Sequence, residues 1–155
     1  MKGDLYDFLV ALGHRESSSN YEAKNNYGFM GRWQFGKPRL YDLGISLDGW
    51  HPKDQPQKRN VSWIEFKKDT LMQDMVALSH IRNLKHQILR YPREFKIGEK
   101  VGGVTITLSG LIAGAHLKGM GGVKNFLAGN DNVDAYGTKI SEYIDKFGDY
   151  NLVEQ

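Results

Sequence analysis

The chain has 155 residues, of which 40% are hydrophobic and 25% are charged, and this composition excludes an intrinsically disordered chain. The length is sufficient for one domain with a core of its own. The net charge of +3 suits a polyanionic partner only weakly, and the absence of cysteine excludes disulfides, a thiol nucleophile and a cysteine-based zinc site.

The sequence shows no membrane or export signal. Its apolar runs are all shorter than the roughly 18 residues of a membrane span. The segment Met1–Leu5 has neither an apolar signal core nor a small-residue cleavage site. We therefore expect a protein that stays inside the cell, leaves it without a cleaved signal, or is a domain cut from a longer chain.

A first helix is predicted after Asp4, whose side chain can cap it. Its apolar stripe has the i, i+3, i+4, i+7 spacing and consists of Leu5, Phe8, Leu9 and Leu12. Polar residues from 14 to 20 end the stripe. Gly13 lowers helix propensity but allows another segment to approach closely.

A structured loop, with a short β-ribbon at most, is predicted for residues 17 to 36, which are rich in glycine, asparagine and aromatic residues. Pro38 then begins a short helix that ends at Leu43, with Gly44 as its stop. Residues 45 to 61 are polar and are expected to form an exposed loop.

The longest helix is predicted to follow Ser62, which has the capping-box spacing to Glu65. The pattern continues to about residue 90, with one break near Asp69. The stripe that keeps the 3.6-residue period, and is expected to face the core, consists of Leu71, Met75, Leu78, Ile81, Leu84 and Ile88.

The last third of the chain predicts a loop or small hairpin over 91–106 and two helices rich in small residues, which are closed by Gly119 and Gly129. A final helix is expected to be capped by Asp131 or Asn132, to bury the face Tyr136, Ile140, Tyr143, Ile144 and Phe147, and to precede a frayed tail. These patterns together predict a single, mainly α domain of about six helices.

Glu16 is the residue on which the functional hypothesis rests. It stands where the apolar stripe of the first helix gives way to a loop rich in glycine and aromatic residues. Burial at such a place disfavours the charged form of a carboxyl group, and a carboxyl that stays protonated near neutral pH can act as a general acid. We expect Glu16 to be the acid of a sugar-cleaving site. A solvated carboxylate at a helix end is the plainer alternative.

Three motifs carry a family resemblance. Glu16-Ser17 comes first, Gly31-Arg32-Trp33-Gln34 second, and residues 114–123 read Gly-Ala-His-Leu-Lys-Gly-Met-Gly-Gly-Val. In this order the chain resembles the lysozyme superfamily, in particular its lytic transglycosylase and goose-type lysozyme branch. That family's core reads Glu-Ser, Gly-Leu-Met-Gln and Ala-Ala-Tyr-Asn-Ala-Gly-x-Gly-x-Val. His116-Leu117 departs from its Tyr-Asn pair.

The resemblance implies a lysozyme-like domain over residues 1–155 that cleaves the β-1,4 bond between N-acetylmuramic acid and N-acetylglucosamine in peptidoglycan. Glu16 would protonate the glycosidic oxygen. Glycosidases usually place a second carboxylate about 5 to 9.5 Å away, but no Asp or Glu occurs between Glu22 and Asp42. A single-Glu site fits the transglycosylase pattern, in which the substrate's acetamido group stabilises the cation and an anhydro sugar forms. Attack by water, as in a muramidase, is the other outcome.

Seven further side chains are expected to bind substrate. The hydroxyl of Ser17 would hold Glu16 or the sugar, amides would bind acetamido groups, aromatic rings would lie against sugar faces, and a histidine would replace the family's tyrosine. These residues are Ser17, Asn25, Gln34, Tyr27, Trp33, Tyr143 and His116. Packing in the core is the competing interpretation for Trp33, Tyr143 and His116.

No metal or cofactor is expected, because the histidines lack zinc-ligand spacing. The expected partner is peptidoglycan, with an immunity or inhibitor protein in addition if the protein is a secreted effector; no nucleic acid and no membrane span are expected. The site of action would be the periplasm or the cell wall.

Two other functions compete with glycan cleavage. One is a non-catalytic module that holds glycan without cutting it, which the missing Tyr-Asn pair favours. The other is a nucleic-acid binder that uses a basic helix face formed by His80, Arg82, Lys85, His86, Arg90 and Arg93. A solvated helix face is the common explanation of such a pattern.

Overall fold

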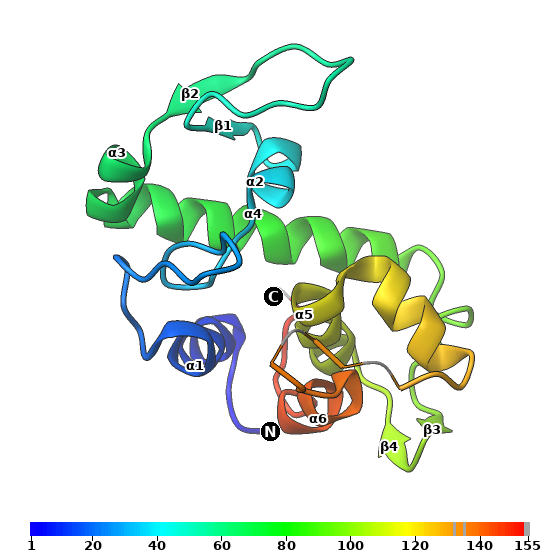
Figure 1. Ribbon diagram of the computed structural model, residues 1–155. Coiled ribbons are helices and arrows are strands. Elements are labelled where there is room, and N and C mark those ends of the chain that lie inside the picture. Colours follow the sequence, from blue (N-terminus) through cyan, green and yellow to red (C-terminus); the bar gives the residue numbers. More distant parts are fainter. Residues whose placement is uncertain (132, 135, 154–155) are drawn as a thin grey trace. The chain divides into compact units, whose positions relative to one another are not determined.

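The computed structural model describes residues 1–131, 133–134 and 136–153. The chain divides into two compact units, which are treated separately: unit 1 is Met1–Phe8 with Ile81–Gln155, and unit 2 is Leu9–His80. The described residues form six helices and two two-stranded sheets (Figure 1), so the mainly α class is confirmed.

Helix α1 (Leu5–Ser17) begins as the sequence predicts. The Asp7 amide donates to the Asp4 carboxylate at 3.1 Å, and the Asp4 amide donates back to the Asp7 carboxylate at 3.1 Å. This reciprocal pair satisfies two backbone donors at the helix start. The pKa of Asp4 is lowered, chiefly because its carboxylate accepts the Asp7 amide.

Unit 2 continues with α2 (Lys37–Asp42), which ends one residue before the predicted end at Leu43. The prediction that residues 45–61 form an exposed loop is wrong at both ends of this segment. Strands β1 (Ile45–Leu47) and β2 (Arg59–Val61) form a parallel pair there, and all of β1 is buried. The Ser46 hydroxyl holds the returning segment by accepting the Lys58 amide at 2.8 Å.

The break near Asp69 is confirmed. Helix α3 (Trp63–Lys68) is capped by Ser62, which accepts the Glu65 amide at 3.1 Å, and α4 (Thr70–Leu89) follows directly. The predicted stripe fails in its first turns: Leu71 and Met75 are 68% and 61% exposed. The residues that bury this part of α4 are Gln73, Val76, Ala77 and His80.

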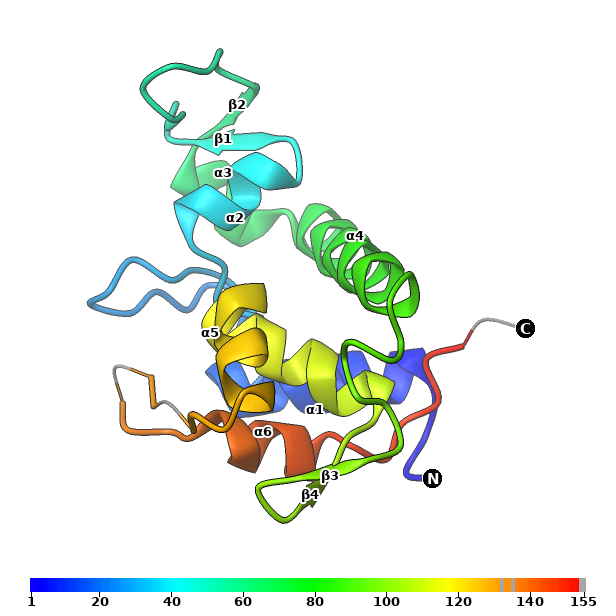
Figure 2. The same ribbon diagram turned by 90° about the vertical axis from the view of Figure 1, so that its right-hand side faces the viewer.

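Unit 1 holds the predicted hairpin, formed by β3 (Lys100–Val101) and β4 (Val104–Thr105), and two helices that lie side by side in both ribbon views, α5 (Leu108–Leu127) and α6 (Ile140–Lys146) (Figure 2). A Cβ atom on Gly110 would meet the Ile144 carbonyl oxygen at 2.5 Å. The small residues of α5 therefore allow the close packing that the sequence predicts.

Gly119 interrupts α5 where the sequence predicts a helix end. Its φ of 73° and ψ of 172° are not helical, so α5 is two helical segments joined by a kink. The left-handed φ explains the glycine, because a side chain there would be strained. His116 lies in the last turn before this kink.

Two predictions about the C-terminal region are wrong. The last helix begins at Ile140, and Tyr136 is 65% exposed rather than part of its buried face. Asp131 still helps to begin the helix, but from ten residues upstream, by accepting the Ser141 amide at 3.1 Å and the Ser141 hydroxyl at 2.6 Å. Asn132, the other predicted cap, lies outside the described residues.

The tail after Gly148 is not frayed as far as Leu152. Tyr150 bridges to Gly3, the Asn151 amide donates to the Gly3 carbonyl at 2.8 Å, and Leu152 is buried. The Lys85 ammonium also donates to the Leu152 carbonyl at 3.1 Å. In the same unit Phe8 packs edge-on against Phe147 and Tyr150.

Candidate active site

Glu16 lies in the last turn of α1, and its side chain is half-buried. The helix ends just after it. The Ser18 amide donates to the His14 carbonyl at 2.9 Å, and the Ser19 amide donates to the Gly13 carbonyl at 3.2 Å. These two hydrogen bonds provide partners for carbonyl groups near the end of the helix, where carbonyl groups otherwise lack helical partners.

Backbone in the left-handed region follows Glu16 directly. Ser18 and Ser19 have φ of 56° and 64°, and Gln34 later in the loop has φ of 57°. A non-glycine residue in this region costs about 1–2 kcal/mol, and such strain clusters at functional sites. Three of the five non-glycine residues with positive φ in the described part of the chain fall in this short segment.

Ser17 fastens the loop to the helix. Its hydroxyl donates to the Arg32 carbonyl at 2.6 Å and lies 3.2 Å from the Gly13 carbonyl, and it accepts the Asn20 amide at 3.0 Å. Gly13 makes room for this contact, since a Cβ there would meet Arg32 Nε at 2.9 Å. Ser17 therefore positions the loop beside Glu16.

Arg32 is the cation of this loop. Its guanidinium contacts two neighbouring rings, 4.9 Å from the Trp33 centroid and 5.2 Å from that of Tyr21, and donates to the Tyr21 hydroxyl at 2.9 Å. Arg32 Nε is buried and makes no hydrogen bond with the described residues. Arg32 Nε would lie 2.9 Å from a Cβ atom on Gly13, so the Arg32 side chain packs against α1 at Gly13, three residues before Glu16.

Tyr21 connects Arg32 to α4. Its hydroxyl donates to the Asp74 carboxylate at 2.7 Å. Burial, followed by the hydrogen bond to Asp74, raises the pKa of Tyr21, and the hydrogen bond from Arg32 opposes this rise only in part. The phenol stays protonated at neutral pH and bridges the cation and the carboxylate.

Gln73 is a buried support that the sequence analysis missed. It is 1% exposed; its side-chain oxygen accepts the Arg32 amide at 2.9 Å, and its side-chain nitrogen donates to the carbonyls of Tyr21 at 2.9 Å and Phe66 at 2.8 Å. Gly31, the residue before Arg32, makes room for the Gln73 side chain, because a Cβ atom on Gly31 would meet Gln73 Oε1 at 2.5 Å. In the sequence, neither Gly31 nor Gln73 alone indicates that the two residues meet.

Asn25 and Tyr27 form an exposed turn. The Asn25 side-chain oxygen accepts the amides of Tyr27 at 2.9 Å and Phe29 at 3.0 Å. Asn25 thus shapes the turn, and the ring of Tyr27 is 59% exposed at its tip. Tyr27 retains the exposed face that a sugar platform needs.

Trp33 and Gln34 take structural positions. Trp33 is 3% exposed and donates to the Leu9 carbonyl at 2.8 Å, so its faces are covered by the protein and the sugar-platform hypothesis does not fit. The amide of Gln34 donates to the Gly31 carbonyl at 2.9 Å and to the Ala23 carbonyl at 3.3 Å. The Gln34 side-chain nitrogen therefore bonds to the backbone of its own loop.

The two candidates in unit 1 differ in burial. Tyr143 is 2% exposed and packs edge-on against Phe147 at 5.3 Å, so it is a core residue. His116 is half-buried on α5, before the kink at Gly119. Of the seven expected substrate-binding residues, Tyr27 is exposed and His116 is half-buried.

A pocket of about 480 Å³ in unit 2 lies along the chain directly after Glu16. Hydroxyl, amide and ammonium groups lie beside apolar surface in its lining, which consists of Ser19, Asn20, Tyr21, Glu22, Lys67, Lys68 and Thr70. Such groups are the hydrogen-bonding partners that a sugar requires.

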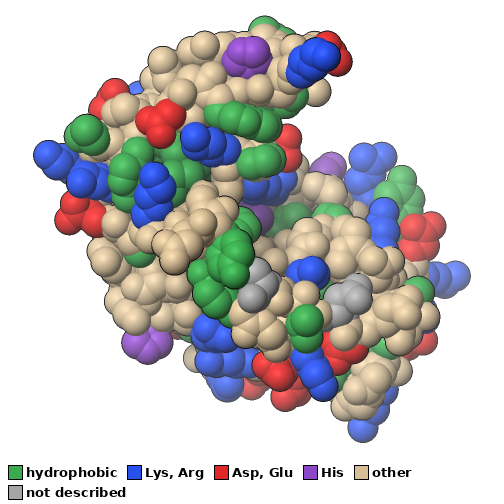
Figure 3. Space-filling view, viewed as in Figure 1, with side chains coloured by type: hydrophobic (Ala, Val, Ile, Leu, Met, Phe, Trp, Pro, Cys, Tyr) green, Lys and Arg blue, Asp and Glu red, His purple; other side chains and the backbone are tan. Residues whose placement is uncertain are grey.

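Two residues of the basic helix face considered for nucleic-acid binding make contacts within the protein instead. His80 is buried and accepts a hydrogen bond from Arg39 Nε at 2.8 Å, and Lys85 is bonded to the tail. On the face shown in Figure 3, lysine and arginine side chains are interspersed with acidic ones. In the part of the chain that the structure describes, no helix is long and apolar enough for a membrane span, and no cluster of acidic residues and histidines has a metal-site arrangement.

No family model matches the chain, and no curated protein or solved structure is significantly similar to it.

Proposed function

We propose that this protein cleaves peptidoglycan glycan strands at the bond between N-acetylmuramic acid and N-acetylglucosamine, with Glu16 as its single catalytic carboxyl group, on a lysozyme-like fold. The observation that carries the proposal is the strained loop around Glu16. Ser18 and Ser19 hold left-handed backbone directly after the carboxyl-bearing turn, and Ser17 ties that turn to Arg32.

Glu16 would act first as an acid. Its proton passes to the glycosidic oxygen as the bond from that oxygen to the sugar's anomeric carbon breaks, and the carbonyl of the substrate's own acetamido group stabilises the resulting cation. The carboxylate then accepts the proton of the attacking hydroxyl group. If that hydroxyl belongs to the same sugar, an anhydro end forms; if it belongs to water, a reducing end forms.

Three features of unit 2 support this assignment. No Asp or Glu lies between Glu22 and Asp42, so the loop that faces Glu16 holds no partner acid. The side chain of Tyr27 is exposed on a turn that Asn25 fixes. The pocket at residues 19–22 offers hydroxyl, amide and ammonium groups that can bind a sugar, and these residues follow Glu16 closely along the chain.

The test compares Glu16→Gln with wild type on purified sacculi, and the readout is the release of soluble muropeptides. Glutamine keeps the shape of the side chain but cannot donate a carboxyl proton, so release should be abolished while the circular dichroism spectrum is unchanged. Glu99→Gln, which makes the same change at an exposed residue of unit 1, is the matched control and should keep full release. Normal turnover by Glu16→Gln would refute the assignment.

The alternative is a glycan-binding module without activity. His116-Leu117 stands where the resembled family has Tyr-Asn, and this departure favours it. Co-sedimentation of the wild-type protein with sacculi, with no loss of turbidity over hours, would support this alternative.

A further inference from the structure

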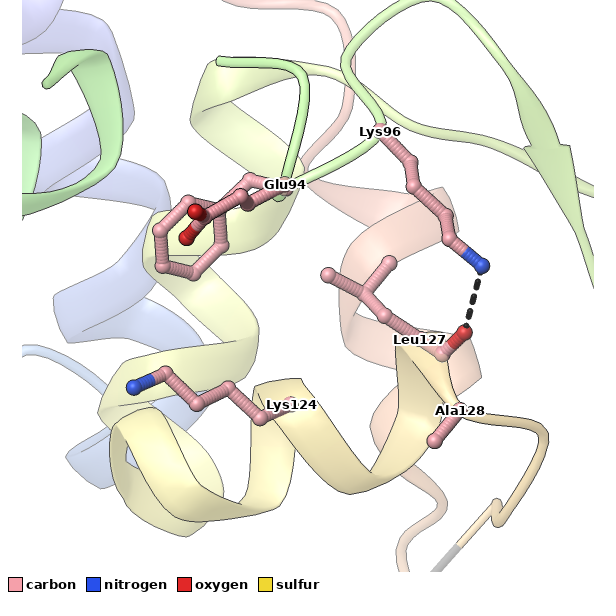
Figure 4. A pocket seen from close by; sticks show the side chains of 6 residues that line it. Glu94, Lys96, Lys124, Leu127 and Ala128 are labelled. Atoms are coloured by element: carbon pink, nitrogen blue, oxygen red, sulfur yellow. Dashed lines mark hydrogen bonds between the residues drawn. The ribbon is translucent and has the colours of Figure 1, made fainter. Parts of the chain in front are cut away.

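Unit 1 contains a pocket that the proposed reaction does not use. It has a volume of about 440 Å³ and lies between the segment 94–96 and the C-terminal turn of α5. This volume is in the range of small-ligand sites. Figure 4 shows the side chains that line it, Glu94, Phe95, Lys96, Lys124, Leu127 and Ala128.

Lys96 builds one wall of this pocket. Its backbone is left-handed, with φ of 55°, and its ammonium donates to the Leu127 carbonyl at 2.9 Å, as the dashed line in Figure 4 shows. Leu127 ends α5, where carbonyl groups lack helical partners. The Lys96 ammonium therefore bonds to the end of α5, and this hydrogen bond fixes the Lys96 side chain along one wall of the pocket.

Two opposite charges are left for a ligand. Lys124 and Glu94 are both exposed, and neither forms an ion pair with another described residue. In Figure 4 the Lys124 ammonium lies on the side of the pocket away from Lys96. The lining of the pocket is mostly apolar, and Phe95 and Leu127 belong to it, although these residues are only 5% and 6% exposed.

An apolar floor flanked by one cation and one anion fits a zwitterionic ligand with small apolar groups. A sugar offers neither charge, and an inorganic anion leaves Glu94 without a partner. We propose that this pocket binds a short peptide that carries both carboxylate and ammonium groups, specifically the stem peptide attached to the glycan strand. This identification of the ligand rests on the proposed function.

The probe is the synthetic peptide L-alanyl-γ-D-glutamyl-L-lysyl-D-alanine, titrated into the full chain carrying Glu16→Gln and followed by amide NMR. Peptide at millimolar concentration should shift the amides of residues 94–96 and 124–128. Lys124→Glu replaces the attraction for carboxylate by repulsion and should weaken binding about tenfold, since a single exposed ion pair is weak.

The matched control is Lys146→Glu, which makes the same charge change at an exposed lysine in the last turn of α6. It should leave peptide affinity unchanged. Equal weakening by both substitutions, or no shifts at millimolar peptide, would overturn the inference. Lys124→Met removes the charge without adding repulsion and serves if Lys124→Glu unfolds; it should bind more weakly than wild type.

The two proposals fail separately. Peptide binding with intact sacculi untouched by wild type would retain this pocket and reject the catalytic assignment. Cleavage that depends on Glu16, without peptide binding at this pocket, would do the reverse.

Discussion

The Glu16–Gln34 segment of unit 2 and the α5–α6 pair of unit 1 are both built around glycine-containing motifs, yet they are stabilised in opposite ways. The first is held by polar side chains that bond to backbone, above all Ser17 and Gln73. The second is stabilised by close helix packing, which is possible because Gly110 and Gly114 have no side chains and let α6 approach α5. A network of side-chain to backbone hydrogen bonds can hold strained backbone next to a catalytic group, whereas close helix packing provides a rigid support.

The largest expected effect comes from Gln73→Leu in the first region. Leucine fills much of the space but leaves the Arg32 amide and the Tyr21 carbonyl without their partner, and the Phe66 carbonyl keeps only the Asp69 amide at 3.3 Å. Unsatisfied buried polar groups cost about 1–3 kcal/mol each, so the free energy of unfolding should fall by about 3 kcal/mol or more. Urea denaturation measures this. A loss below about 1 kcal/mol, comparable to one ordinary hydrogen bond, would show that Gln73 is not the support described.

Gly110→Ala tests the second region. The added methyl group meets the Ile144 carbonyl, which is backbone and cannot turn aside. Overpacking costs about 1–3 kcal/mol and exceeds the helix-propensity gain of alanine, about 1 kcal/mol at most. The unfolding midpoint in urea should therefore fall. Gly121→Ala, on the same helix with no atom within 4 Å of the added Cβ, should raise it; if both substitutions raise the midpoint, the close packing is not limiting.

Tyr21→Phe removes the bridge between Arg32 and Asp74 and should cost about 1 kcal/mol at neutral pH. The pH dependence has a definite sign. The folded pKa of Tyr21 is raised, mainly by burial, so this stabilisation is fully present below the unfolded tyrosine pKa of about 10 and is lost as pH rises through the higher folded value. Stability measured across this alkaline range should decline more steeply for wild type than for Tyr21→Phe. Parallel curves would contradict the raised pKa.

The smallest expected effect has the opposite direction. Ser18→Gly relieves a left-handed residue, with φ of 56°, and should stabilise the protein by up to about 1 kcal/mol after the entropic cost of glycine. Ser79→Gly, at an exposed position inside α4, should instead destabilise by about 1 kcal/mol. Thermal unfolding of the two variants distinguishes them. If both substitutions lower the melting temperature, the backbone at Ser18 is not strained.

Sequence patterns predicted the local features well. The Asp4 and Ser62 caps and the interruption at Gly119 each depend on residues within one helical turn. The errors lie where distant segments meet. Strands β1 and β2 are three residues each and pair across a long loop, and Asp131 caps α6 from ten residues away. No periodicity in so short a segment indicates such partners.

The candidate site shows the same division. The sequence indicates Glu16 as a candidate because a helix end and a loop motif adjoin there, and its catalytic role stays a prediction. The close approach at Gly13 is confirmed. Gln73 and Arg32 were missed, because their contacts link segments about 40 residues apart. For Trp33 the sequence left both a sugar platform and core packing open, since a tryptophan in a glycine-rich loop has the same local pattern in a core and in a binding surface. Its 3% exposure fits the core interpretation.

The most direct test of the central claim, that Glu16 is the sole catalytic carboxyl group, is an amide scan. Each of the 18 Asp and Glu residues is changed singly to Asn or Gln, and muropeptide release from sacculi is measured for every folded variant. The account predicts that Glu16→Gln alone abolishes release and that the other variants keep at least part of it. A second folded variant with no release, or full release by Glu16→Gln, would contradict the claim.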